Sequence, residues 1–116
     1  SNIAFINKDL ELVVPSFENT LKGTTITKIM DYVEKELIPN NIISGISRKE
    51  TNIDDIFNGR IIEAFFVGGD FLIPLLEIEN YKFYNNEDQE DKVGKFSRMF
   101  QEFLNTFFLE ILSARY

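Results

Sequence analysis

The residues best suited to binding a ligand surround a glycine that precedes a helix-like segment. In the stretch TLKGTTITK, Gly23 is followed by Thr24 and Thr25 at the point where an amphipathic pattern begins. A helix N-terminus has unpaired backbone N–H groups and a partial positive charge, so a small, hydroxyl-bearing lead-in can bind a phosphate or another anion. The same residues also have a plainer interpretation, in which Gly23 makes a turn and one threonine only caps the helix.

A second glycine pair could bring more backbone amides to the same place. Gly68 and Gly69 follow the run IIEAFFV, which is typical of a strand buried on both faces that ends in a close backbone approach. Glycine pairs are also common in ordinary turns, so this motif alone specifies no ligand. If the two glycine corners face one pocket, the sequence predicts an anion site made of amides and hydroxyls.

Composition excludes several other kinds of site. The chain has no cysteine and no histidine, which excludes disulfides, zinc sites with Cys or His ligands, and Ser-His or Cys-His catalytic pairs within it. The formal net charge of −7 argues against nucleic acid as a partner, because binding a phosphate backbone needs clustered Lys and Arg. No apolar run is long enough for a membrane span, and no leader segment is visible. We expect a cytoplasmic protein without a metal site.

The elements that must position these corners follow from the spacing of apolar residues. A hairpin is expected in residues 3–15, and a helix runs from Thr25 and must end before Pro39. We also expect a strand at 42–47, a short helix at 51–59 capped by Thr51 or Asn52, strands at 61–69, 71–78 and 80–84, and a last helix within 93–112. The aromatic stripe of the last helix makes it an expected core element. This order predicts one α+β domain with a mixed sheet, a short mid-chain helix and two longer packed helices.

Taken in order, these motifs resemble the C-terminal region of the fold-type IV pyridoxal phosphate enzymes. That family includes branched-chain aminotransferases, D-amino acid aminotransferases and 4-amino-4-deoxychorismate lyases. The matching pieces are residues 2–5, 14–15, 21–25, 47–48, 53–57 and 63–68, so that the resemblance covers nearly the whole chain. It implies the pseudo-barrel of the family's large domain, with residues 1–116 as a C-terminal fragment of that domain.

The resemblance also implies a site for pyridoxal 5'-phosphate. Its phosphate would be held by residues of both glycine corners, namely Gly23, Thr24, Thr25, Gly68 and Gly69. The next two residues, Asp70 and Phe71, fall where the family's aminotransferases offer backbone amides to the substrate carboxylate.

Three residues depart from the family pattern at this site. Ile26 stands where the family has an arginine, and Gly69 stands where it has a second phosphate-binding threonine. Asp70 replaces an alanine, and its carboxylate should weaken the binding of a phosphate or a carboxylate because like charges repel.

In the family, the lysine that forms the Schiff base and the small N-terminal domain both precede the strand that matches residues 2–5. No lysine of this chain matches the catalytic position, so the resemblance implies a fragment that is inactive alone. The parent would be a homodimeric branched-chain-aminotransferase-like enzyme that exchanges an amino group between an amino acid and a 2-oxo acid. The alternatives are a 4-amino-4-deoxychorismate lyase, a degenerate non-catalytic homologue that acts as an interaction module, and an unrelated acidic α+β domain.

Overall fold

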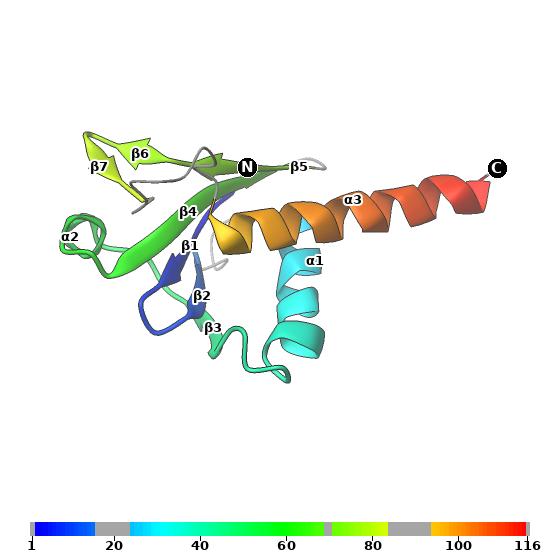
Figure 1. Ribbon diagram of the computed structural model, residues 1–116, viewed down its shortest axis with the longest axis horizontal. Helices are drawn as coiled ribbons and strands as arrows, with labels where there is room; N and C mark the ends of the chain where they lie inside the picture. The colour runs from blue at the N-terminus through cyan, green and yellow to red at the C-terminus, as the bar shows by residue number, and fades with distance from the viewer. Residues whose placement is uncertain (1, 16–23, 69–70, 84–93, 116) are drawn as a thin grey trace.

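The computed structural model describes residues 2–15, 24–68, 71–83 and 94–115, and it is built on a five-stranded mixed sheet (Figure 1). The strand order across the sheet is β3 (Gly45–Arg48), β2 (Glu11–Val14), β1 (Asn2–Asn7), β4 (Ile61–Gly68) and β5 (Phe71–Leu75). Neighbouring strands are antiparallel except β2 and β3, which are parallel. The α+β fold with a mixed sheet is therefore confirmed.

The predicted hairpin is formed by β1 and β2, with Phe5 opposite Val13 in the register. Its turn is fixed by Asn7, whose side-chain oxygen accepts the Glu11 backbone N–H at 2.9 Å. The Asn7 amide nitrogen donates to the Glu11 carboxylate, also at 2.9 Å. Leu10 has a φ of 60°, so this turn includes a left-handed residue.

The first predicted helix is α1 (Thr24–Tyr32), which continues as the π-helix η1 (Val33–Leu37) and ends before Pro39. The wider turns of η1 are marked by the Ile38 N–H, which donates to the Val33 carbonyl at 2.8 Å. This helical segment connects β2 to the parallel strand β3, a connection that a tight turn cannot make. The strand itself begins three residues later than the sequence predicts, at Gly45.

The short mid-chain helix and the last strands agree with the sequence prediction, except that one predicted strand is divided in two. Helix α2 (Ile53–Phe57) is capped by Asn52, whose side-chain oxygen accepts the Asp54 N–H at 3.1 Å, so Asn52 is the cap of the two that the sequence offers. The strand expected at 71–78 is divided into β5 and β6 (Glu77–Ile78). As expected, the next segment pairs with it, because β7 (Tyr81–Lys82) forms a two-stranded sheet with β6.

The sheet has one core on each face. Helices α1 and α3 (Lys95–Arg115) cover one face, and α2 with β6 and β7 covers the other. Alternation along the strands supplies both cores. The first core takes Ala4, Ile6, Leu12, Val14, Phe65, Val67 and Leu72 from the sheet, and the second takes Phe5, Val13, Ile61 and Ala64.

The N-terminus of helix α3 is capped by a carboxylate from the sheet. Glu63 of β4 is only 8% exposed, and its Oε1 accepts the Ser97 backbone N–H at 2.9 Å and the Ser97 hydroxyl at 3.0 Å. Its Oε2 accepts the Phe96 N–H at 3.0 Å. A Cβ on Gly94 would overlap this carboxylate, so the residue before the helix leaves room for a cap from 33 residues away. An acidic group at a helix N-terminus is also favoured by the helix dipole.

The predicted aromatic stripe of α3 serves as core in its first half. Phe96, Phe100 and Leu104 are buried against the sheet and α1. Further along, the helix projects beyond the sheet (Figure 1), and Leu109 is 63% exposed. Within the described residues, no helix is both long and apolar enough to span a membrane.

Candidate functional site

The first predicted corner is the start of α1. Thr24 is the first residue of this nine-residue helix, and no acidic residue lies in its first turn, where a carboxylate would oppose the binding of an anion. Thr25 is buried. Gly23 lies outside the described residues. The described part of this corner is therefore a helix N-terminus without an acidic side chain in its first turn.

The second predicted corner is the connection between β4 and β5. Gly68 ends β4 and is paired with Phe71, the first residue of β5, while Gly69 and Asp70 lie outside the described residues. The Phe71 side chain is 57% exposed. Phe66 and Ile73, which oppose each other in the same hairpin and lie on the same face as Phe71, are also exposed. An apolar patch thus borders this corner.

Strand direction brings the chain segments of both corners to one end of the sheet. Asn2 of β1 is opposite Val67 of β4, so β1 begins where β4 ends. Because β2 is antiparallel to β1, it ends at this same end of the sheet, at Val14. The next element along the chain is α1. Helix α1 then packs against β4. This topology is what a pocket shared by the two corners requires.

Ile26, which stands where the resembled family has an arginine, is a core residue. The Ile26 side chain is completely buried and belongs to the core between the helices and the sheet. Its role here is packing, because a side chain enclosed in that core does not reach a ligand at the helix N-terminus.

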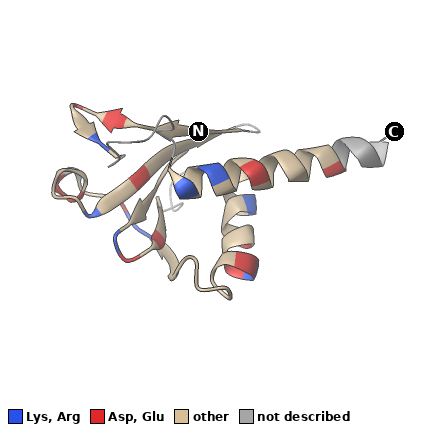
Figure 2. Cartoon of the chain, in the orientation of Figure 1, with Lys and Arg blue, Asp and Glu red and all other residues tan. Residues whose placement is uncertain are grey.

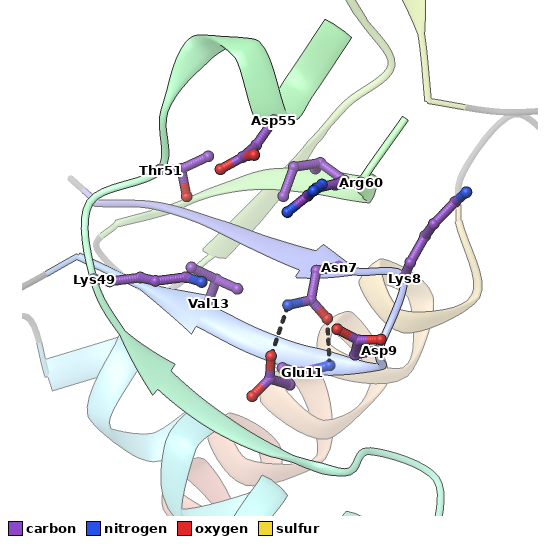
Figure 3. A pocket seen from close by; sticks show the side chains of 10 residues that line it. Asn7, Lys8, Asp9, Glu11, Val13, Lys49, Thr51, Asp55 and Arg60 are labelled. Carbon is purple, nitrogen blue, oxygen red and sulfur yellow. Dashed lines mark hydrogen bonds between the residues drawn. The ribbon is translucent and has the colours of Figure 1, made fainter. Parts of the chain in front are cut away.

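A different pocket, of about 310 Å³, lies at the other end of the sheet (Figure 3). It includes Ile61, the first residue of β4, whereas the glycine corner follows the last residue of that strand. Seven residues of strand separate these positions, which is about 23 Å. This pocket and the predicted anion site are therefore separate places on the molecule.

The charges around this pocket are of both signs. Lys8, Lys49 and Arg60 line it together with acidic residues from the β1–β2 turn, from β2 and from α2, which are Asp9, Glu11 and Asp55. Figure 3 shows Lys49 and Arg60 on opposite sides of the pocket. With three formal charges of each sign, the pocket has no clear preference for an anion or a cation.

Sequence reasoning missed this pocket because its lining comes from separate parts of the chain. Residues 7–13 supply one wall, and residues 49–55 and 60–61 supply the rest. Each charge taken alone is typical of a solvated turn, so spacing carries no signal for the group. Among the described residues, no cluster of three or more acidic side chains is arranged to hold a metal ion.

Comparisons with solved structures find close matches in fold. An assignment as a branched-chain amino acid aminotransferase has been made provisionally for a Thermotoga maritima protein, which superposes with a TM-score of 0.68 at 18% identity and covers 94% of this chain and 35% of its own. The 4-amino-4-deoxychorismate lyase of Pseudomonas aeruginosa gives 0.66 at 16% identity, with 91% of this chain and 34% of that chain covered.

A third match carries the cofactor. The branched-chain amino acid aminotransferase of Thermobaculum terrenum, in its holo-form with pyridoxal phosphate, gives a TM-score of 0.63 at 16% identity, covering 90% of this chain and 31% of that one. No protein-family model and no curated protein matches the sequence. The chain spans about a third of the length of the solved structures that it matches. It thus has the fold that fold-type IV aminotransferases and 4-amino-4-deoxychorismate lyase share over that third.

Proposed function

We propose that this chain is the phosphate-binding part of the large domain of a fold-type IV pyridoxal phosphate enzyme, most like a branched-chain aminotransferase. The observation that carries the proposal is the shared sheet end. Strand β2, after which the chain continues to α1, ends at the end of the sheet at which β4 stops, in a fold whose solved examples include pyridoxal phosphate-bound aminotransferases. Helix N-termini and glycine turns are common binding sites for phosphate groups.

The described residues fit the phosphate of this cofactor. Thr24 and Thr25 begin a helix with no acidic residue in its first turn, and Gly68 has no side chain to limit the approach of a ligand to its backbone. We assign Gly23 and Gly69 to the same cradle, with Asp70 and Phe71 at the substrate end. The negative charge of Asp70 opposes an anion there, so we expect weaker binding than a neutral residue would allow.

The cofactor, when bound, supplies the electron sink for moving an amino group between an amino acid and a 2-oxo acid. The residues of this chain would bind and orient it through its phosphate. The lysine that holds the cofactor would come from the remaining part of a longer, dimeric protein. The exposed apolar patch of Phe66, Phe71 and Ile73 beside the corner supports this arrangement, because a further part of such a protein would bury it.

A second candidate function is a non-catalytic homologue that keeps the scaffold. The buried packing role of Ile26 favours it, because the arginine that the family places there is replaced by a core residue. A 4-amino-4-deoxychorismate lyase remains an alternative within the enzyme class, since its solved structure matches about as well as the aminotransferases do. Release of pyruvate by the full protein would identify the lyase, and amino transfer to a 2-oxo acid would identify the aminotransferase.

The phosphate assignment is testable with the chain itself. We would titrate isotopically labelled protein with pyridoxine 5'-phosphate, which lacks the aldehyde and cannot react with surface lysines, and follow backbone amide shifts by NMR. The proposal predicts shifts at Thr24, Thr25 and Gly68, and none of comparable size with pyridoxine, which has no phosphate.

A matched pair of variants sharpens this test. Thr24→Pro removes one N–H and one hydroxyl at a position where proline is compatible with a helix, and it should weaken binding. Thr106→Ala removes an exposed hydroxyl from α3 and should leave binding unchanged. Unaltered binding by Thr24→Pro, or shifts confined to Lys8, Lys49 and Arg60, would show that the phosphate binds elsewhere. Complete absence of binding would favour the non-catalytic homologue.

A further inference from the structure

A groove of about 500 Å³ lies between the end of the α1–η1 segment and α3, away from the glycine corners. Its floor is aromatic and its rim is acidic. Tyr32 stacks on Phe103 with ring centroids 4.3 Å apart and an angle of 6° between the planes. Phe103 in turn lies against Phe107, with centroids 6.3 Å apart. Three glutamates, Glu36, Glu102 and Glu110, line the groove with these rings.

The groove residues of α3 form two parallel stripes. Met99, Phe103 and Phe107 recur every four residues and make an apolar stripe, whose members are half-buried. Glu102, Thr106 and Glu110 recur with the same spacing and make an exposed polar stripe beside it. Four residues of helix rise about 6 Å, so both stripes repeat at the interval at which a second helix presents its own i and i+4 side chains.

The residues that line the groove include three glutamates and no lysine or arginine. Lys35 of the neighbouring η1 pairs with Asp31 at 3.0 Å, outside the groove. Lys28 lies at one end, where its ammonium is 4.8 Å from the centroid of Phe107. Figure 2 shows basic residues at the start of α3 and acidic residues further along it. The middle of the groove is therefore a region of negative charge.

Tyr32 lies within reach of these negative charges. Burial raises the pKa of its phenol, and the charges of Glu36 and Glu102 raise that pKa further. The local backbone is also unusual, because Tyr32 is the residue that precedes the π-helix η1. Such π-helical turns are rare and are frequently found at functional sites.

From the spacing of the stripes and their charge, we infer that this groove binds a basic amphipathic helix of a partner protein. The apolar face of that helix would lie on Met99, Phe103 and Phe107, and its Lys or Arg residues would meet Glu102 and Glu110. This is helix-in-groove recognition, in which apolar anchors give affinity and charges set the register. A small organic cation would pair with one carboxylate and would not contact the residues that repeat along both stripes. The two stripes therefore favour a helix as the ligand.

The probe for this inference is a synthetic helical peptide with arginine at every fourth position beside a stripe of leucines. Its binding to the chain is measured by fluorescence anisotropy at low and at high salt. We expect saturable binding that weakens with salt, and chemical-shift changes centred on Tyr32, Glu102 and Thr106. A peptide of the same composition in scrambled order, and free arginine amide, should bind far more weakly.

Variants separate the groove from the overall acidity of the protein. The double variant Glu102→Gln/Glu110→Gln should weaken peptide binding by about tenfold, as expected for the loss of two charge contacts at an exposed rim. The matched double variant Glu34→Gln/Glu77→Gln removes two exposed charges outside the groove and should bind like the wild type. Equal loss in both variants, equal binding of the scrambled peptide or of arginine amide, or the absence of binding would each overturn the inference.

Discussion

Replacing Glu63 by glutamine tests whether α3 depends on a cap supplied by the sheet. The substitution preserves the shape of the side chain but turns one of its two acceptor oxygens into an NH₂ group. Glu63 accepts from the Ser97 N–H and hydroxyl with Oε1 and from the Phe96 N–H with Oε2. The single oxygen of glutamine can accept either from Ser97 or from the Phe96 N–H, but not from both. Its NH₂ group must then face a backbone N–H.

The expected loss of stability can be worked from these contacts. One hydrogen bond to a charged acceptor contributes about 1.5–3 kcal/mol, and a buried N–H left without a partner costs about 1–3 kcal/mol. Loss of the negative charge at the helix N-terminus adds about 0.3–1 kcal/mol. Since these effects overlap, we expect the free energy of unfolding to fall by about 3 kcal/mol. That is a large part of the total of about 5–15 kcal/mol for a typical domain.

The measurement is urea and thermal unfolding followed by circular dichroism. A loss of 3 kcal/mol should lower the melting temperature by about 12 °C for a domain of this size. The control is Glu77→Gln, which removes an exposed carboxylate from β6 and should change stability by less than about 0.5 kcal/mol. A loss below about 1 kcal/mol for Glu63→Gln, or equal losses in both variants, would refute the capping argument.

Three further predictions concern single positions. Gly94→Ala should destabilise the protein by about 1–3 kcal/mol in the same unfolding assay, because the new Cβ displaces the Glu63 carboxylate, and wild-type stability would contradict this. The raised pKa of Tyr32 means that the folded protein holds the phenol proton more tightly than the unfolded chain, so stability from this group is present below about pH 10 and is lost as the pH rises above it. Urea midpoints of the wild type should therefore fall more steeply above pH 10 than those of Tyr32→Phe, and parallel curves would be evidence against it. Asn52→Ala should cost about 1 kcal/mol and speed amide hydrogen exchange in α2, whereas unchanged exchange there would mean that the cap is dispensable.

The local elements could be read from the sequence because their causes are local. Alternating apolar residues specify the β1–β2 hairpin, and the four-residue spacing that stops before Pro39 specifies the α1–η1 segment. Asn52 and Gly59 bracket α2 through a side-chain cap and a left-handed φ of 84°. Each signal acts within a few residues of chain, and sequence patterns detect such signals directly.

The long-range features could not be read in this way. No pattern near residue 95 indicates that α3 is capped by Glu63, because the two partners are 33 residues apart. The spacing of apolar residues also gives no sign that the segment 71–78 is divided into β5 and β6, or that the α-helix changes to a π-helix at Val33. Local propensity is a weak guide to such features because tertiary context routinely overrides it.

The candidate sites also differ in whether their residues are adjacent in the sequence. The glycine corners could be named because their residues are adjacent in sequence and occur in the order of a known family. The pocket of Lys49 and Arg60 and the groove of Phe103 and Glu102 are assembled from segments that only the fold brings together. Both kinds of site depend on the fold, but only the glycine corners have a motif of consecutive residues that can be recognised in the sequence.

The position of β1 in the sheet has a consequence for how the protein is made. Between β1 and its partner β4 the ribosome must add about 55–65 residues, judged from the paired positions Asn7–Ile61 and Asn2–Val67. At a synthesis rate of about 5–20 residues per second, the nascent hairpin waits several seconds with one side of β1 unpaired. During that interval the unpaired side of β1 can pair with a strand of another growing chain, so the nascent domain has a strand edge at which aggregation can begin.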